Sequence, residues 1–189
     1  MKSELFISRQ EFEDIIEISS HCGYDSLSQF ILTTQDTLLH DKLGGGFYYD
    51  LLQNHCEDAY KPVMNGSEYL GCEDETLYHK GIKFALAYLS YAQKIKAGDA
   101  HDTPFGTRKK VSMDSVPLTD SETANQYNYY HNVGMSHLSR TLDYLCRNKE
   151  TFTAFKGHCE EVVSTPRLGG SSVLSNSYIE EKGECNDCR

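Results

Sequence analysis

The chain has 189 residues, a formal net charge of -10 at pH 7 and an isoelectric point of about 5.2. This acidic balance argues against a general binder of nucleic acids or anionic membranes, because phosphate groups would be repelled. No run of about 18 apolar residues is present, so no membrane-spanning helix is expected, and the first five residues lack the apolar core of a secretory signal, which favours a protein made in a cytoplasm.

Four elements are predicted in the N-terminal third of the chain. A capping box at Ser8–Glu11 and the apolar positions that follow it predict a helix over about 9–19. An apolar stripe predicts a second helix over 26–42, which the glycines at 44–46 end. Residues 47–52 begin a short third helix, and residues 61–71 are interpreted as connecting structure with a turn at Asn65-Gly66.

A central helix is predicted over about 73–97. At 100° per residue its apolar and aromatic side chains cover an arc of roughly 220°. Only Lys83, Ala87, Ser90 and Lys94 face the other way. A helix this apolar must contact neighbours on several sides, so we interpret it as the buried centre of a helical bundle.

Residues 98–118 form a long excursion from the bundle. Asp102 and Phe105 lie in a turn-forming stretch, and the residues from Thr107 to Met113 can be extended as part of a hairpin. The densest basic cluster of the chain, Arg108, Lys109 and Lys110, lies here. A loop of this length is typically functional; a solvated charge run is the other reading of the cluster.

A second capping box, Thr119–Glu122, predicts a long helix over 120–147. Its main stripe runs from Tyr127 to Leu145 and is assigned to the core. A weaker second stripe is assigned to contact with another subunit, and it consists of Tyr130, Val133, His137 and Tyr144.

Beyond Lys149 the composition changes to a glycine- and serine-rich segment with small apolar clusters such as Tyr178/Ile179. Such a segment cannot build its own core, so we expect it to fold on a partner. The sequence therefore predicts a helical domain over 1–149 and an extended C-terminal arm over 150–189.

The chain carries weak signals for metal or redox chemistry and none for catalysis. Seven cysteines, an odd number at scattered positions, suit reduced thiols better than a disulfide framework. Cys185 and Cys188 have the spacing of half a zinc site, but a second pair at similar spacing is missing. No nucleophile elbow or phosphate loop is present. We expect no enzymatic activity and no cofactor; the alternative left open is a small cytosolic metal-binding regulatory protein that uses Cys185 and Cys188.

A series of short motifs carries a resemblance. Lys42-Leu43-Gly44 precedes the aromatic run at 47–52, then come residues 60–66 with Tyr69, Lys80–Lys83 leading into the central helix, the turn at 102–106 and the tyrosine-rich last helix. Over about 30–147 the chain resembles the helical head-to-tail connector proteins of tailed bacteriophages, in particular the ring proteins of crAss-like phages of Bacteroidetes.

The resemblance implies a ring protein of the phage neck or tail. It implies a dodecameric homo-oligomer that joins portal to tail, continues the DNA channel without reading sequence, and contacts the portal and other ring proteins. The expected protein is thus an all-α virion structural protein, made in the host cytoplasm: a small helical bundle with a long loop or β-hairpin excursion at 98–118 and a C-terminal arm.

Overall fold

The computed structural model describes residues 5–18, 24–71, 75–98, 100–103, 106–109 and 119–156. Its elements, in chain order, are α1 (Arg9–Ile15), α2 (Tyr24–Thr34), the π-helix η1 (Gln35–Leu39), α3 (His40–Leu43), α4 (Gly45–Asn54), the 3-10 helix η2 (Asp58–Tyr60), α5 (Lys61–Asn65), β1 (Ser67–Leu70), β2 (Thr76–His79), α6 (Gly81–Ala97), β3 (Ala100–Thr103), β4 (Gly106–Lys109) and α7 (Asp120–Arg147).

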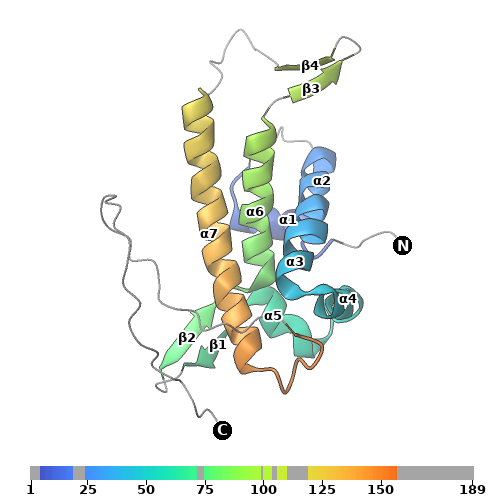
Figure 1. Cartoon of the computed structure of the whole chain (residues 1–189), viewed down its shortest axis with the longest axis vertical. Helices are drawn as coiled ribbons and strands as arrows, with labels where there is room; N and C mark the ends of the chain where they lie inside the picture. The colour runs from blue at the N-terminus through green and yellow to red at the C-terminus, as the bar shows by residue number, and fades with distance from the viewer. Residues whose placement is uncertain are drawn as a thin grey trace, which may run out of the picture.

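The helices form a thin layer. α7, α6 and the α2–α3 run stand side by side, α1 lies behind α6, and α4 and α5 close the lower end (Figure 1). Two antiparallel hairpins are added to the layer: β1–β2 beside the C-terminal half of α7, and β3–β4 beyond the opposite end of α6. The predicted fold class, a helical bundle with a hairpin excursion, is confirmed.

The capping boxes fix the starts of α1 and α7 as predicted. The Ser8 side chain accepts from the backbone N–H of Glu11, and the Glu11 carboxylate accepts from the backbone N–H of Ser8. Thr119 and Glu122 make the same reciprocal pair at α7. α7 spans the predicted range, whereas α1 ends at Ile15 and is shorter than predicted.

The predicted start of the central helix at residue 73 is wrong. Residues 76–79 form strand β2, which pairs with β1 in the register Ser67↔His79 and Leu70↔Thr76. Gly81 has φ +77°, a left-handed conformation that glycine adopts without strain, and α6 begins there. The segment interpreted as connecting structure at 61–71 is likewise the short helix α5 followed by β1.

α6 is buried on more sides than its sequence predicts. Ala87 and Ser90, expected to face away from the core, are both fully buried. α1, α2, α5 and α7 all contact this helix. The interpretation of α6 as the centre of the bundle is therefore correct, and the apolar arc underestimated how completely its neighbours surround it.

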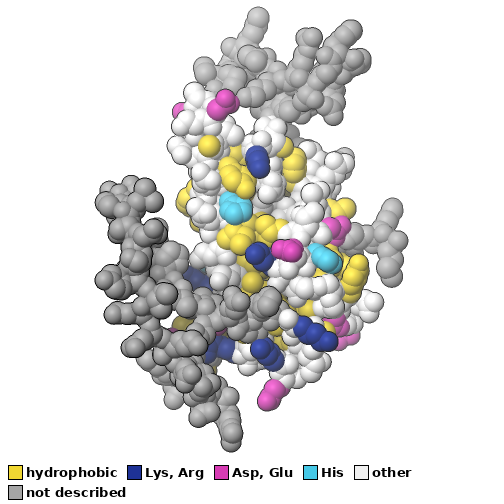
Figure 2. Space-filling model, in the orientation of Figure 1, with side chains coloured by type: hydrophobic (Ala, Val, Ile, Leu, Met, Phe, Trp, Pro, Cys, Tyr) yellow, Lys and Arg dark blue, Asp and Glu magenta, His cyan; other side chains and the backbone are white. Residues whose placement is uncertain are grey.

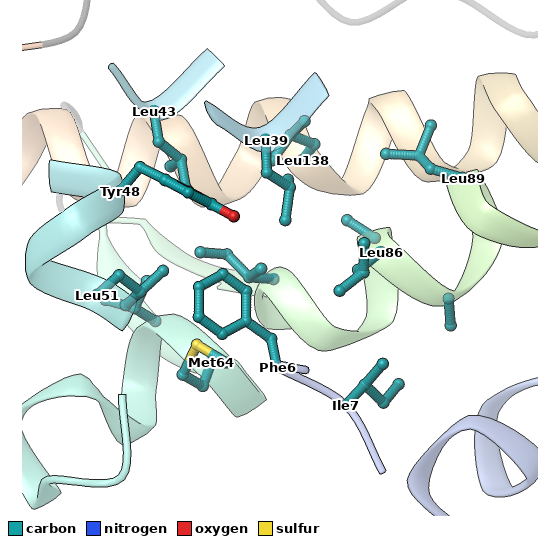
Figure 3. Packing of buried hydrophobic residues seen from close by; sticks show 14 of the residues in the cluster. Phe6, Ile7, Leu39, Leu43, Tyr48, Leu51, Met64, Leu86, Leu89 and Leu138 are labelled. Atoms are coloured by element: carbon teal, nitrogen blue, oxygen red, sulfur yellow. The ribbon is translucent and has the colours of Figure 1, made fainter. Parts of the chain in front are cut away.

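The core fills the space between α6 and the other helices. Figure 3 shows Phe6 between Met64 and Tyr48, with Leu86 of α6 and Leu138 of α7 nearby. The backbone N–H of Phe6 donates to Oε1 of the buried Gln35 at 3.0 Å, which ties the N-terminal segment to η1. The buried chain continues past the predicted domain end at 149, because Phe152 and Phe155 pack edge-on against Phe47.

The described cysteines differ in state. Cys56 is a free, exposed thiol, whereas Cys146 is disulfide-bonded. The expectation of reduced thiols therefore fails at Cys146.

Gly134 allows α6 and α7 to approach closely. A Cβ built at this position would lie 2.6 Å from Cγ of Leu89 and 3.1 Å from its backbone nitrogen. We expect Gly134→Ala to lower the free energy of unfolding by about 1–3 kcal/mol through overpacking, which outweighs the roughly 1 kcal/mol that alanine gains in a helix. Urea denaturation measures this change.

The control for Gly134 is Gly46, also helical, where an added Cβ meets only Ala154 O at 3.7 Å. Gly46→Ala is expected to stabilise the fold slightly. If both substitutions stabilise it, the close packing of α6 on α7 is not needed for folding.

Candidate interaction surfaces

The inner face of the β1–β2 hairpin is fastened to α7 through His79. This side chain is fully buried. Its ring stacks on Tyr144 at 4.4 Å between centroids, Nε2 lies 3.0 Å from Ser67 Oγ, and Nδ1 lies 3.3 Å from Thr141 Oγ1. Burial lowers the pKa of His79 to about 4, so the imidazole is neutral near pH 7.

The hydrogen bonds around His79 favour one neutral tautomer. Thr141 Oγ1 donates to the carbonyl oxygen of His137 at 3.1 Å, so its lone pairs face His79 and accept from Nδ1–H. Nε2 then accepts from the Ser67 hydroxyl. Although a hydroxyl next to an imidazole is one part of a nucleophilic triad, Nδ1 faces a threonine rather than an orienting carboxylate. The arrangement is that of a satisfied core histidine.

A second attachment lies beside the first. The Tyr69 hydroxyl donates to Asp143 Oδ2 at 2.8 Å, and Arg147 Nε donates to the same oxygen at 3.0 Å. Burial and the neighbouring Asp143 carboxylate raise the pKa of Tyr69 well above its usual value. Both inward-facing aromatic groups of the hairpin are thus held by α7.

The outer face of the hairpin carries large apolar side chains in water. Leu70 is 65% exposed and Tyr78 is 54% exposed. In the register of the hairpin they lie diagonally across from each other, since Leu70 is opposite Thr76 and Tyr78 is opposite Glu68. This surface is not predicted from the sequence, because the apolar pattern favours a helix over residues 73–80.

A second surface follows the seam between α6 and α7. It is a run of mostly half-buried rings that we call the aromatic ladder: Phe84, Tyr88, Tyr91, Tyr129, Tyr130 and His137. Phe84 stacks on Tyr88 at 4.8 Å, and Tyr130 contacts Tyr91 edge-on at 4.7 Å. Tyr129, which touches Tyr130, is 60% exposed. Figure 2 shows one face of the molecule, with hydrophobic side chains along the seam between α6 and α7.

Lysines flank the ladder at both ends. Lys80 Nζ lies 4.2 Å from the ring centroid of Phe84, and Lys94 Nζ lies 5.4 Å from that of Tyr91. Burial raises the pKa of both Tyr88 and Tyr130 and lowers that of His137 to about 4. The ladder is therefore an uncharged strip bordered by cations, a mixture that is typical of partly wet protein interfaces.

The structure places the predicted subunit-facing stripe mostly against its own chain. Tyr130 contacts Tyr88 and Tyr91, His137 contacts Phe84, and Tyr144 contacts His79. Val133 is half-buried. Only the outer edges of these side chains remain for another subunit, and the strongly exposed neighbour, Tyr129, was not predicted.

The other predicted interface residues fall on or beyond the β3–β4 hairpin. Asp102 lies in β3, and Arg108 and Lys109 lie in β4, where the register pairs Asp102 with Thr107. This confirms the hairpin. The remaining candidates lie outside the described residues: Phe105, Lys110, Tyr178, Ile179, Cys185 and Cys188.

An open groove of about 520 Å³ lies between the N-terminal segment, α1, α5 and α6. Both lysines in its wall are already paired, Lys83 with Glu11 and Lys61 with Asp58. Burial works to raise the pKa of Glu11, but its hydrogen bonds from Lys83 and Ser8 outweigh this and leave the pKa below its usual value. The groove therefore offers no uncompensated lysine charge to a ligand.

Two further properties hold for the described parts of the chain. They contain no cluster of three or more His, Cys, Asp or Glu side chains that could hold a metal ion. None of their helices is both long enough and apolar enough to cross a bilayer.

Comparison with known proteins gives one match. Residues 39–164, from η1 through α7 and beyond, match the model of a family of unknown function, DUF6712. No curated protein and no solved structure matches the chain. Because the matched region spans about two thirds of the sequence, the chain belongs to the DUF6712 family.

Proposed function

We propose that this protein is a virion structural protein without enzymatic activity, which forms a homo-oligomeric ring in the neck or tail of a tailed bacteriophage. The ring joins the portal to the tail and continues the DNA channel. The resemblance of residues 30–147 to phage connector proteins motivates the proposal, and the distribution of exposed apolar side chains on the helical layer supports it.

The observation that carries the proposal is the presence of two separate apolar surfaces on one thin layer. The outer face of β1–β2 lies beside the C-terminal half of α7, and the aromatic ladder lies along the seam between α6 and α7, with its most exposed ring, Tyr129, in the N-terminal half of α7. A closed ring is built from head-to-tail contacts, so each subunit must present two different faces. A single apolar patch would instead favour a two-fold dimer.

The charge of the chain fits a channel that DNA crosses without binding. A net charge of -10 repels the phosphate backbone. In this scheme the basic residues Arg108, Lys109 and Lys110 meet acidic partner surfaces or DNA at one rim of the ring.

Direct imaging tests the proposal. Electron microscopy of the purified full-length chain at high protein concentration, and of the intact particle, is expected to show a closed ring around a central channel. A particle whose neck and tail contain no copy of this chain contradicts the proposal.

Charge reversal tests the role of the basic hairpin. Changing Arg108, Lys109 and Lys110 together to glutamate is expected to weaken ring assembly or tail attachment, which sedimentation velocity and imaging measure. The control reverses three exposed lysines elsewhere, Lys42, Lys149 and Lys156, with the same change in net charge. Equal effects of the two triple variants would show that only total charge matters.

A further inference from the structure

The exposed apolar pair on the β1–β2 hairpin is unusual in its setting. Among the described residues only four large hydrophobic side chains are strongly exposed, and two of them, Leu70 and Tyr78, share this four-residue-long, two-stranded surface. A hairpin of this size is marginal by itself in water. Its stability comes from the inner face, so the apolar outer face is not explained by folding.

The hairpin is already rigid before any partner arrives. Tyr69 is held by Asp143, and His79 is held by Thr141 and by stacking on Tyr144. These contacts fix the backbone of the hairpin. A partner strand would therefore bind without a large entropic cost for ordering the hairpin.

Among the described residues, neither outer edge of the hairpin has a neighbouring strand, since no third strand joins β1 and β2. The only backbone hydrogen bond that extends their pairing within these residues runs from Gly71 N–H to Glu75 O, at the turn end of the hairpin. Unpaired strand edges beside exposed apolar side chains are the surface on which an extended segment adds as a new strand.

Near its end, the described chain passes close to the part of α7 that holds the inner face of the hairpin. Phe152 lies 6.1 Å from the ring of Tyr144, and Tyr144 stacks on His79 of β2. Residues 157–189 follow, a length that spans on the order of 100 Å when extended. This is enough to reach the same hairpin on an adjacent copy.

The sequence of that arm contains one segment suited to a strand. From Leu168 to Ile179 no residue is charged, and the pair Gly169-Gly170 precedes the apolar part. The part that follows has β-branched or aromatic residues at Val173, Tyr178 and Ile179 and contains no proline. Strand alternation places Leu174 and Tyr178 on one face.

We propose that the β1–β2 hairpin is the docking site for residues 172–180 of a second copy of this chain, which add as a third strand at one edge and bring their apolar side chains onto the face that carries Leu70 and Tyr78. This inference rests on the proposed ring and names the contact that links its subunits. The hairpin projects from the α7 edge of the helical layer (Figure 1), and adjacent copies in a ring meet at such edges.

Photo-crosslinking in the full-length chain tests the contact. The photoreactive amino acid p-benzoylphenylalanine replaces Tyr78 in a mixture of ¹⁴N- and ¹⁵N-labelled copies, and mass spectrometry identifies the linked peptides. The same replacement at Tyr49, which is 60% exposed on α4, is the control. We expect crosslinks from position 78, and not from position 49, to residues 172–180 in pairs of mixed isotope.

A substitution on the hairpin gives a second measurement. Leu70→Glu, at a side chain too exposed to be needed for folding, is expected to reduce the yield of these crosslinks about tenfold, as the lost burial of one leucine implies. Tyr49→Glu is the matched variant and should leave the yield unchanged. Equal yields in both variants overturn the docking site.

The outcomes separate the two proposals. If oligomers form but crosslinks from position 78 do not include residues 172–180, or include them only within one copy, this contact is overturned. That outcome does not contradict the proposed ring. A chain that stays monomeric at every concentration and forms no mixed-isotope pairs counts against both.

Discussion

Gly81→Ala is expected to lower the free energy of unfolding by about 3–5 kcal/mol, or to prevent folding, although it adds one methyl group. Gly81 has φ +77°, and a Cβ at this position would lie 2.4 Å from the carbonyl oxygen of Met64 and 2.5 Å from the backbone nitrogen of Gly66. Both neighbours are backbone atoms of the α5–β1 junction, so neither can turn away as a side chain would. Guanidinium denaturation followed by circular dichroism measures the loss.

Gly44 provides a matched control, because it has nearly the same φ, +78°, with no atom within 4 Å of an added Cβ. Gly44→Ala therefore introduces backbone strain of about 1–3 kcal/mol without a clash. The difference between the two variants isolates the cost of the close approach. Similar losses in both would mean that the backbones at residues 64–66 and 81 separate easily.

Gly66 completes the same junction from the other side. Its φ is +93°, and an added Cβ would lie 2.3 Å from the carbonyl oxygen of His79. The two glycines let the end of α5 lie directly on the β2–α6 boundary. This contact brings His79 and the hairpin to α7, so the surface proposed for docking depends on it.

The sequence predicts the long helices well because their signals are local. The reciprocal pairs Ser8/Glu11 and Thr119/Glu122 mark the starts of α1 and α7, and the apolar arc of α6 indicates its central position. The glycine at position 44 ends the α3 run with a positive φ, as its place after an amphipathic stripe predicts. None of these signals needs information about distant residues.

What the sequence does not predict depends on contacts between distant residues. His79 is buried because its ring contacts Thr141, which is 62 positions away in the sequence, and stacks on Tyr144. Thr76–His79 alone is too short for its alternation to outweigh the apolar arc that follows, so the sequence predicts a helix where β2 lies and connecting structure where β1 lies. Likewise, Tyr130 and His137 form a stripe that fits a partner helix equally well in the same chain or in another. Only the folded structure shows that this stripe packs against α6.

The same buried histidine gives the protein an expected sensitivity to acid. The pKa of His79 is about 4 in the fold, against about 6.5 for an ordinary histidine. Between these values the unfolded chain binds a proton that the folded chain does not, so stability falls as the pH drops from 6.5 through 4 and is fully present above 6.5. At 1.36 kcal/mol per unit the loss for this buried group is about 3 kcal/mol. His137, whose pKa is also about 4, acts in the same direction.

The carboxylates with lowered pKa values titrate at a lower pH than that at which protonation of the histidines lowers stability. Glu11 and Glu122 start from about 4.5 and are shifted down, so their stabilisation is lost mainly below the histidine window. Urea titrations at several pH values between 7 and 4 therefore report chiefly on the histidines.

Two variants assign the acid sensitivity to His79. His79→Gln should be less stable at pH 7, because it loses the stack on Tyr144, but its stability should depend less on pH between 6.5 and 4. Thr141→Val removes the hydrogen-bond partner of Nδ1 and keeps the titrating ring, so it should lose stability at pH 7 and retain the pH dependence. If the stability of His79→Gln depends on pH in the same way as that of the unmodified chain, protonation of His79 is not the cause of the stability loss in acid.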